Sequence, residues 1–382
     1  MTRKIFIAVI SFYLLLSGFN AVCQEGRIVR ETVDSPSLEG NLLGDSTRRQ
    51  VTIYLPPSYD DGGNLAYPVV YLLHGYTGNN NLWTGGSYIS GNIVNSMSFW
   101  LQNGKVKEMI LVMPNSYNRL WGSYYTNSIA TGNWADFIAR DLVQYIDSSY
   151  RTLAQRESRA VIGHSMGGYG GLKLGMLYPD VFVCIGGMAG DYDVEKQMDS
   201  NKSTFAYIST IRDWGQLSSL GFQTIFIARA VAYAPNPDNP PFYCDLPFVY
   251  TDDKPREIVK NPETYDRFME HDIFRIAEAR TDILLNARAI YIDCGTSDGN
   301  IEAARAIHDK LNGLGVDHVY KEFSGDHTCC VMTSTGNALE VFSNAMAFEM
   351  LVNVEHISKL VTTWATVKAC HERRASNEMD NN

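Results

Sequence analysis

The chain has 382 residues, of which 45% are hydrophobic and 19% are charged, as in an ordinary globular protein. That length accommodates one large α/β domain with insertions, or two domains. The net charge is −10 and basic residues adjoin only in short pairs, so nothing indicates a nucleic-acid partner. The 12% aromatic content suits a cleft for rings or sugars, and suits a large core equally well.

The first 23 residues have the pattern of a signal peptide. A positive end precedes an apolar stretch at 5–16 and an imperfect small-residue cleavage site at 21–23. The apolar stretch is too short to span a membrane, and no later one is long enough. We therefore expect export to the periplasm or the cell exterior, with 24–382 as the mature α/β domain. Lipid attachment at Cys23 is the alternative.

Six cysteines follow the signal peptide, and an exported chain of this size permits disulfides without needing them. Cys184 and Cys294 lie in apolar, strand-like runs, which predicts buried thiols. Cys329 and Cys330 stand close to His327 and raise the question of a metal site. No second ligand cluster at zinc-like spacing accompanies them, so we expect no metal site.

Several apolar patterns in the first half predict regular elements. Residues 50–55 alternate as a strand does, 69–73 are apolar throughout and indicate a central strand, and 109–113 predict another buried strand. Residues 133–150 carry an apolar face at helical spacing. Residues 24–49 look like a polar lead-in without an element of their own.

The loop after the strand at 69–73 begins His74-Gly75-Tyr76. Folds that place a nucleophile on a sharp strand-to-helix turn take one oxyanion donor, a backbone N–H, from a loop at this position. We assign this donor to Tyr76. His74 precedes the candidate nucleophile along the chain, against the usual order, so we expect it to brace the loop.

Aromatic side chains gather in the loops beyond these strands. Trp83, Trp121 and Tyr124 are candidate substrate contacts, because open α/β sheets bind ligands past the carboxyl ends of their strands. Packing of the loops explains the same residues equally well.

The region around Ser165 combines three signals. Residues 160–162 predict a buried strand, Gly163-His164-Ser165-Met166-Gly167 fits the G-x-S-x-G pattern, and 168–177 predict a helix. Such a turn exposes the central hydroxyl at the top of the sheet, above a helix N-terminus. We expect Ser165 to be a nucleophile and the Met166 N–H to be an oxyanion donor. The simpler alternative is a glycine-rich turn in which Ser165 merely caps the helix.

A serine hydroxyl becomes a good nucleophile when a base takes its proton and a third group orients that base. Strands predicted at 289–294 and 316–323 are followed by Asp298 and His327, which gives the order Ser165…Asp298…His327. His327 would then accept the serine proton. Asp298 would hold the imidazole tautomer and stabilise the imidazolium.

Three other acids compete with Asp298. Asp293 lies inside its strand, and Asp326 is too near the base along the chain to face its ring. Asp191 follows the strand after the nucleophile and is the serious rival, although we favour Asp298. The other histidines lack a suitable setting and are expected to be structural or surface imidazoles: His164, His271, His308, His318, His356 and His371.

Strands and helices alternate up to Gly190, which predicts a mostly parallel sheet flanked by helices. A strand at 181–185 follows the helix after Ser165. Residues about 191–286 break the alternation and predict a cap inserted over the sheet, with a stiff proline-rich loop at 235–241. The remaining expectations are helices at 301–311 and 337–352 and a C-terminal tail at about 355–382.

Together these motifs resemble the putative-esterase family of α/β-hydrolases, which includes S-formylglutathione hydrolases, enterochelin esterases, mycolyltransferases, and feruloyl and acetylxylan esterases. The resemblance covers about 50–345 apart from the insertion. The matching pieces are Ile53-Tyr54-Leu55-Pro56-Pro57, Tyr71-Leu72-Leu73-His74-Gly75-Tyr76, Val112-Met113-Pro114-Asn115, Gly122-Ser123-Tyr124-Tyr125, Gly163-His164-Ser165-Met166-Gly167-Gly168-Tyr169-Gly170, Gly295-Thr296-Ser297-Asp298 and Gly325-Asp326-His327.

The resemblance implies an α/β-hydrolase fold, a triad of Ser165, Asp298 and His327, and oxyanion donors at Tyr76 and Met166. It also implies a carboxylic-ester substrate and no cofactor. Thr328-Cys329-Cys330 follow the last histidine where many relatives have an aromatic residue, and the insertion is longer and more aromatic than in compact members. Both departures bear on acyl and alcohol specificity rather than on the triad.

The sequence therefore predicts an exported serine esterase that forms an acyl-enzyme. Export and aromatic content favour feruloyl or acetyl esters of polysaccharides, or small esters, as substrates, by analogy within the family. Three alternatives stay open: an acyltransferase of the mycolyltransferase type, a thioesterase like S-formylglutathione hydrolase, and a non-catalytic carbohydrate-binding relative. The pattern predicts no oligomeric state.

Overall fold

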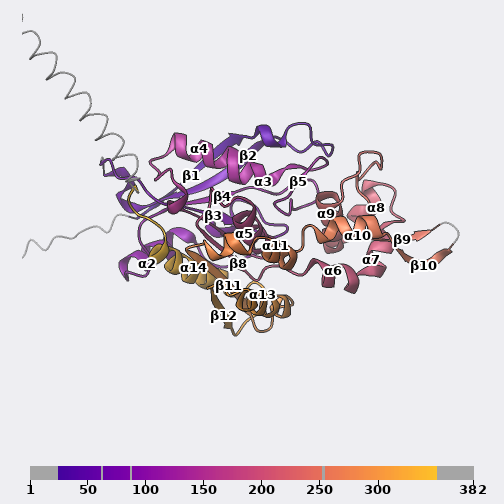
Figure 1. Ribbon diagram of the computed structural model, residues 1–382. Helices are drawn as coiled ribbons and strands as arrows, with labels where there is room; N and C mark the ends of the chain where they lie inside the picture. The colour runs from indigo at the N-terminus through magenta and orange to yellow at the C-terminus, as the bar shows by residue number, and fades with distance from the viewer. Residues whose placement is uncertain (1–24, 62, 87, 252–253, 351–382) are drawn as a thin grey trace, which may run out of the picture.

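A computed structural model describes residues 25–61, 63–86, 88–251 and 254–350 (Figure 1). An eight-stranded sheet with the order β1-β2-β4-β3-β7-β8-β11-β12 forms its centre. The signal peptide, Cys23 and the tail at about 355–382 lie outside the described residues. The strands are β1 (Arg27–Asp34), β2 (Arg48–Leu55), β3 (Val69–Leu73), β4 (Ile110–Pro114), β7 (Arg159–Gly163), β8 (Cys184–Met188), β11 (Ala289–Gly295) and β12 (Val319–Phe323).

Six neighbouring strands from β4 to β12 run parallel, and β2 is antiparallel to both β1 and β4. The sheet is therefore mostly parallel, as the alternation of strands and helices predicts. Because parallel strands share a direction, the carboxyl ends of β3, β7 and β11 lie at one edge, and the loops after them meet there.

Two apolar cores cover the two faces of the sheet, which explains why β3 is apolar throughout. Val69, Tyr71 and Leu73 belong to one core, and Val70 and Leu72 belong to the other, since successive side chains of a strand point to opposite faces. The first core is built with α3 (Trp134–Asp136), α4 (Val143–Ser149), α5 (Met166–Leu177), α11 (Ile273–Ala279) and α13 (Ile301–Gly313), and the second with α2 (Ile93–Gln102) and α14 (Val331–Ala345).

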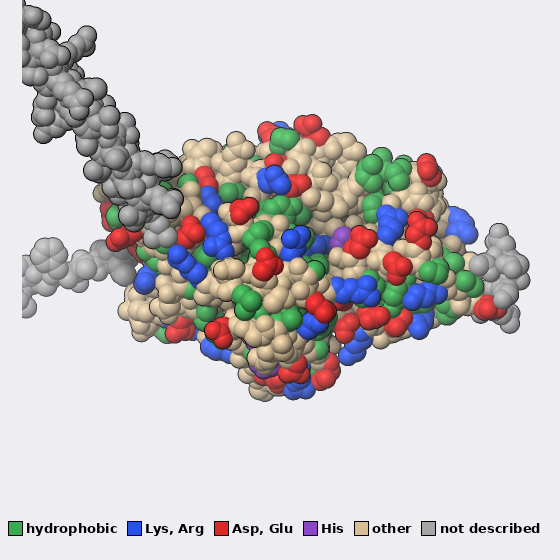
Figure 2. All heavy atoms as spheres, viewed as in Figure 1, with side chains coloured by type: hydrophobic (Ala, Val, Ile, Leu, Met, Phe, Trp, Pro, Cys, Tyr) green, Lys and Arg blue, Asp and Glu red, His purple; other side chains and the backbone are tan. Residues whose placement is uncertain are grey.

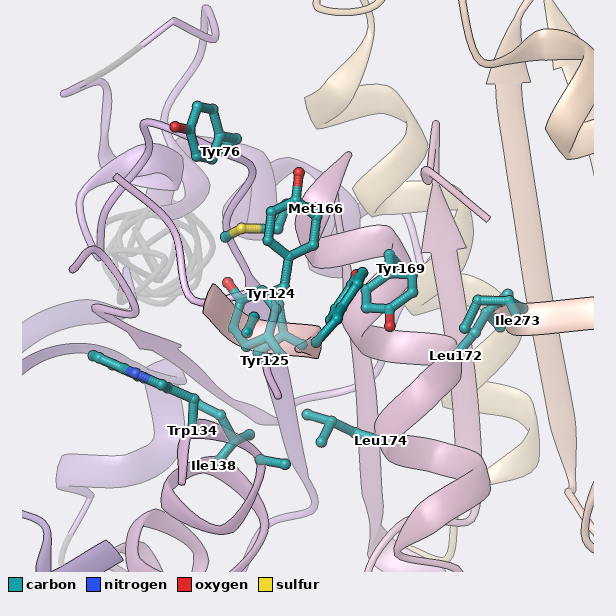
Figure 3. Close-up of a cluster of buried hydrophobic side chains, with 14 of the residues drawn as sticks. Tyr76, Tyr124, Tyr125, Trp134, Ile138, Met166, Tyr169, Leu172, Leu174 and Ile273 are labelled. Atoms are coloured by element: carbon teal, nitrogen blue, oxygen red, sulfur yellow. The ribbon is translucent and has the colours of Figure 1, made fainter. Parts of the chain in front are cut away.

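Figure 3 shows part of the first core around α5. Leu172 lies beside Ile273 of α11, while Leu174 points toward Ile138 and Trp134 on the other side of α5. The helix predicted at 133–150 is present, with a wider π-helical turn at Phe137–Leu142 between α3 and α4. The prediction of one apolar helical face is therefore confirmed.

Three predicted elements have different bounds in the structure. The strand expected at 181–185 begins only at Cys184, because the Val181 and Phe182 N–H groups bond the Tyr178 carbonyl in a turn after α5. The last strand begins at Val319 rather than Val316, whose N–H closes the end of α13. The late helix expected at 337–352 begins at Val331, six residues earlier, and ends at Ala345.

β1 was missed altogether in the polar lead-in. It is an edge strand that pairs with β2 along its whole length, and most of its side chains are exposed or half-buried. An edge strand held by backbone hydrogen bonds needs no apolar alternation, so its sequence carries little signal.

The segment expected as an insertion contains short helices and a hairpin. Figure 1 shows α6 to α10 and the β9–β10 hairpin grouped together at one end of the molecule, whereas α11 packs against α5 and α13. The elements are α6 (Val194–Ser200), α7 (Lys202–Ile208), α8 (Trp214–Ser218), α9 (Thr224–Tyr233), β9 (Phe248–Thr251), β10 (Lys254–Lys260), α10 (Pro262–Met269) and α12 (Thr281–Leu285). We refer to α6–α10 with this hairpin as the cap.

Acidic and basic side chains are intermixed over the face seen in Figure 2. Among the described residues, no helix combines the length and apolar character needed to cross a membrane.

Glycines allow α5 to lie directly on the sheet, so adding a side chain at one of them should destabilise the fold. A Cβ at Gly171 would meet the Gly186 carbonyl oxygen at 2.2 Å, whereas Gly313, at the end of α13, has open space around it. We expect Gly171→Ala to lower the free energy of unfolding by about 1–3 kcal/mol. Gly313→Ala should leave it unchanged or raise it by up to about 1 kcal/mol. Urea denaturation measures both, and equal effects of the two substitutions would contradict the close approach.

Candidate active site

Ser165 lies on a strained turn between β7 and α5. Its φ of 59° and ψ of −118° fall where non-glycine residues are rarely found. The flanking glycines are required by space, because a Cβ at Gly163 or Gly167 would meet the Leu73 carbonyl oxygen at 2.3 Å or 1.9 Å. The Ser165 side chain makes no capping hydrogen bond to α5. The simpler alternative, in which the hydroxyl caps the helix, therefore does not describe this turn.

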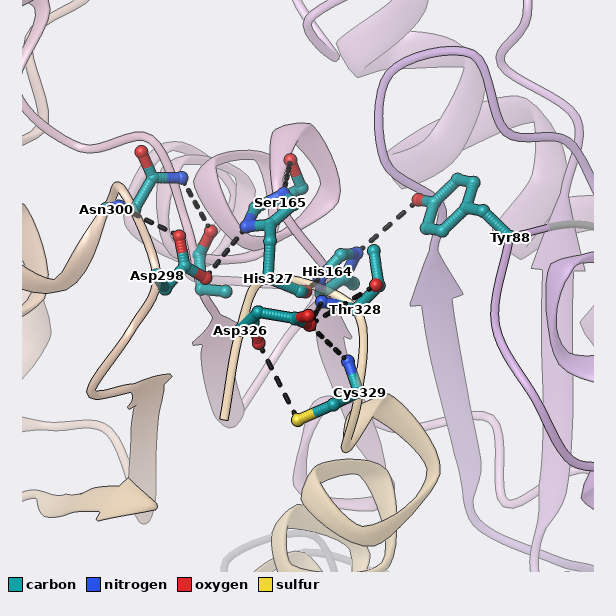
Figure 4. A network of polar contacts seen from close by, with 10 residues as sticks. Tyr88, His164, Ser165, Asp298, Asn300, Asp326, His327, Thr328 and Cys329 are labelled. Carbon is teal, nitrogen blue, oxygen red and sulfur yellow. Dashed lines mark hydrogen bonds and ion pairs between the residues drawn. The ribbon is translucent and has the colours of Figure 1, made fainter. Parts of the chain in front are cut away.

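The three residues predicted as a triad form one hydrogen-bonded chain (Figure 4). His327 Nε2 lies 2.9 Å from Ser165 Oγ, and His327 Nδ1 lies 2.8 Å from Asp298 Oδ2. Because Nδ1 faces a carboxylate, it carries the ring proton, and Nε2 is free to accept the proton of the serine hydroxyl. The Asn300 N–H donates to the other Asp298 oxygen at 2.8 Å.

Asp298 is held in its charged form. Burial by itself raises the pKa of this carboxyl, but the hydrogen bond from His327 and the imidazolium charge outweigh burial and bring the pKa below its usual value. An ionised Asp298 beside Nδ1 would favour an imidazolium at His327.

The rival acids have other partners. Asp191 forms an ion pair with Arg229, and Asp293 is buried and accepts a hydrogen bond from Tyr291. Burial raises the pKa of Asp293 to about 6. Asp326 accepts backbone N–H groups from its own loop. Of the four acids, Asp298 is the one whose carboxylate bonds the imidazole of the candidate base.

His164, which the sequence did not single out, lies against the candidate base. Its Nε2 is 2.7 Å from the His327 carbonyl oxygen and therefore donates to it, while the Tyr88 hydroxyl lies 3.4 Å from Nδ1. Burial, then the charge of His327, lower the pKa of His164 to about 3. His164 thus stays neutral and ties the Ser165 turn directly to the loop that carries His327.

The two residues assigned as oxyanion donors lie close to Ser165. Met166 is the first residue of α5, where a backbone N–H has no acceptor within the helix. A Cβ at Gly75 would lie 3.1 Å from Ser165 Cβ, which places the loop of Tyr76 beside the hydroxyl. Tyr76, Met166 and Ser165 all line one cavity.

His74 braces this loop, as the sequence predicts. The Ser116 N–H donates to His74 Nε2 at 2.9 Å, so Nδ1 carries the proton and donates to the Gly75 carbonyl at 2.8 Å. Burial lowers the pKa of His74 to about 4, which keeps the ring neutral.

The aromatic candidates for substrate binding separate into three cases. Tyr124 lines the cavity at Ser165. Trp121 is outside the lining and packs on Tyr76, with ring centroids 6.3 Å apart. The prediction for Trp83 was wrong: its ring is fully buried in the second core, and its Nε1 donates to Thr335 Oγ1 at 3.1 Å. The loop that carries Trp83 turns inward as a short 3₁₀ turn instead of facing the cavity.

The cavity has a volume of about 330 Å³ and lies between the sheet edge and the cap. The sheet side supplies Ser165, Met166, Tyr76, Tyr124, Asp298 and His327, and the cap supplies Gln197, Phe222, Gln223, Ile225, Phe226 and Arg229. The sequence did not point to the cap residues, because no motif marks which face of an inserted helix will be turned toward the nucleophile.

The cysteines that the structure describes are free thiols. Cys184 and Cys294 are buried free thiols, as predicted. Cys329 and Cys330 have Sγ atoms 2.6 Å apart and are also free thiols. Within the part of the chain that the structure describes, no three His, Cys, Asp or Glu side chains are grouped so as to hold a metal ion.

A buried lysine on α5 is a second residue that the sequence did not reveal. Lys173 Nζ lies 2.7 Å from Thr126 Oγ1, 3.0 Å from the Tyr169 hydroxyl and 3.0 Å from His271 Nδ1. Burial lowers the pKa of Lys173 to about 7 and holds the pKa of His271 well below its usual value. These contacts join α5 to the segment just after α10.

Comparison with known proteins places the chain in a family. The family model described as "Putative esterase" matches residues 45–330. The chain belongs to the putative esterase family. It is 26% identical over 284 residues to Esterase MT1326 of Mycobacterium tuberculosis, covering 72% of this chain and 52% of that protein. This family member therefore spans about half the length of that relative.

Two further relatives add detail. An endo-1,4-beta-xylanase/feruloyl esterase of Xylanibacter ruminicola is 27% identical over 172 residues, covering 42% of this chain and 22% of that protein. Among solved structures, a ferulic acid esterase superposes with a TM-score of 0.60 at 20% identity, covering 85% of this chain and 99% of that one. At that identity the likeness shows the α/β-hydrolase fold.

The geometry predicts that Asp298 and Asp191 differ in their effects on turnover. Asp298→Asn should lower kcat for p-nitrophenyl acetate by about 10⁴-fold, because the imidazole loses the carboxylate that fixes its tautomer. Asp191→Asn should have a far smaller effect on this small ester. Steady-state kinetics measure both, with circular dichroism to confirm folding. A larger loss from Asp191→Asn would make Asp191 the orienting acid instead.

The low pKa of Lys173 predicts a pH-dependent stability. Between about pH 7 and pH 10.5 the unfolded chain holds a proton on Lys173 that the folded chain lacks, so this group makes the free energy of unfolding rise with pH. Lys173→Met removes that dependence. The free energy of unfolding of the variant, minus that of wild type, should therefore increase as pH falls from about 10 to 7. Urea denaturation at several pH values measures the difference, and a constant difference would contradict a neutral buried lysine.

Proposed function

We propose that the protein is a carboxylic-ester hydrolase that acts through an acyl-enzyme on Ser165. The observation that carries the proposal is the hydrogen-bonded chain Ser165–His327–Asp298, whose three residues line one cavity together with Tyr76 and Met166. Membership of the putative esterase family supports the same reaction class.

The proposed reaction follows from this geometry. Ser165 Oγ attacks the carbonyl carbon of the ester while His327 Nε2 takes the hydroxyl proton. The N–H groups of Met166 and Tyr76 hold the negatively charged oxygen of the tetrahedral intermediate. That intermediate collapses, His327 gives its proton to the departing alcohol, and the acyl group stays on Ser165.

Water completes the cycle. His327 removes a proton from a water molecule, which attacks the acyl carbonyl, and the second intermediate breaks down to the free acid and Ser165. Asp298 stays ionised throughout and stabilises each imidazolium.

For the substrate, we propose feruloyl or acetyl esters of polysaccharides. Two observations support this: the Xylanibacter relative is named a feruloyl esterase, and the rings of Tyr76, Tyr124, Phe222 and Phe226 line the cavity. Phe222 meets Tyr76 edge to face, with centroids 5.5 Å apart. Polymeric substrates lie outside the cytoplasm, so the proposal includes export directed by residues 1–23.

The test is hydrolysis of p-nitrophenyl acetate and methyl ferulate by wild type, Ser165→Ala and Ser148→Ala. Ser148 is exposed on α4, away from the cavity, and serves as the matched control. Ser165→Ala should lower kcat by about 10⁴- to 10⁶-fold, since the nucleophile and its base act as a unit, and Ser148→Ala should match wild type.

The two esters test the esterase activity and the feruloyl specificity separately. Cleavage of both supports the feruloyl assignment, and cleavage of the acetate alone removes it but keeps the esterase. Cleavage of neither, or unchanged activity in Ser165→Ala, rejects the proposed hydrolase. Product analysis with a sugar acceptor present would reveal acyl transfer as the alternative fate of the acyl-enzyme.

A further inference from the structure

A buried ion pair joins the cap to the sheet edge at the wall of the cavity. Arg229 on α9 pairs with Asp191, in the loop after β8, and their side chains are 7% and 13% exposed. Both residues line the cavity that contains Ser165. In so enclosed a place a charge is stable only when it has a partner, so each residue fixes the position of the other.

The Arg229 guanidinium also contacts two other segments. Its Nε donates to the Tyr124 hydroxyl at 2.9 Å, in the loop after β4, and its Nη1 donates to Gln197 Oε1 at 3.4 Å, on α6. A planar guanidinium with donors in a fixed fork is suited to hold several groups in one geometry, which a lysine ammonium is not. Arg229 thus links two loops of the sheet edge to two helices of the cap.

The same face of α9 forms the cavity wall. Ile225 and Phe226 lie four and three residues before Arg229, so the three side chains share one side of the helix, and all three line the cavity. Farther along the helix, the Ser128 hydroxyl donates to the Val231 carbonyl at 2.7 Å. The end of α9 therefore has its own attachment, whereas the wall-forming part is attached through Arg229.

We propose that Arg229, held by Asp191, is a specificity-determining residue that positions the α9 wall over Ser165 and so selects esters with a large aromatic acyl group over acetyl esters. The inference rests on the proposed esterase function and deepens it. A small acetyl group reacts without touching the wall, because the triad and the oxyanion donors all belong to the sheet side. A flat aromatic acyl group packs against the wall, so the wall must lie at a fixed distance from Ser165 for the ester carbonyl to be placed correctly.

The experiment uses two esters with the same leaving group, p-nitrophenyl acetate and p-nitrophenyl ferulate. For Arg229→Met, the ratio of kcat/KM for ferulate to that for acetate should fall about 10- to 100-fold, since a displacement of about 1 Å costs that much for a group that must be positioned. The loss should appear mainly as a higher KM for ferulate, and the change in kcat/KM for acetate should be the smaller of the two. Arg229→Lys keeps the charge opposite Asp191 and should restore part of the ratio.

A matched control separates specificity from stability. Arg159 at the start of β7 forms a comparably buried ion pair with Asp147, at 9% and 18% exposure, at the opposite end of the sheet. Arg159→Met should lower the melting temperature and leave the ferulate-to-acetate ratio unchanged. Should Arg229→Met fail to fold, Asp191→Asn, which removes the charge and keeps the shape, is measured in its place with the same expectation of a lower ratio.

An unchanged ratio in both Arg229→Met and Asp191→Asn would overturn the inference, as would a wild type that hydrolyses the acetate and not the ferulate. These results differ from a failure of the proposed function. In that case the wild type hydrolyses neither ester, and the inference falls with the function on which it rests.

Discussion

The structure depends on the close approach of three backbones at one turn. The chain leaves β7, reverses at Ser165 with a positive φ, and enters α5 while still touching the end of β3. Glycine at 163 and 167 is the physical condition for that approach, since any side chain would strike the Leu73 carbonyl. The same compression exposes the hydroxyl, frees the N–H of Met166 and brings the Tyr76 loop alongside. The backbone strain at Ser165 and the exposure of its hydroxyl thus have the same cause.

Around this turn the structure fixes the base from two sides. Asp298 bonds the far nitrogen of the His327 ring, and His164 bonds the His327 backbone. His164 belongs to the same turn as Ser165, so the nucleophile and the base are attached through one adjoining residue. Neither contact leaves a buried charge unpaired, because burial keeps His164 neutral while Asp298 faces the imidazole.

The sequence reveals features that depend on local patterns and misses those that depend on distant contacts. The G-x-S-x-G turn and the positions of Asp298 and His327 after strands are local, and the structure brings these three residues together. β1 is held by backbone pairing and leaves no apolar pattern. Trp83 resembled a surface aromatic, but its loop folds into the core. Arg229 and Lys173 each have a partner about a hundred residues away along the chain, and no local spacing in the sequence records such a contact.

The first core continues without a break from the sheet into the cap. Tyr71 and Leu73 of β3 belong to the same apolar cluster as Phe205 of α7 and Phe268 of α10. The cap is therefore not a detachable module. Removal of the cap would expose the part of the first core that also supports α5. The chain would then lose the turn at Ser165 together with the cap. In such an architecture, substrate specificity can change through substitutions on the inner surface of the cap. It cannot change through loss of the cap, because the fold would be lost as well.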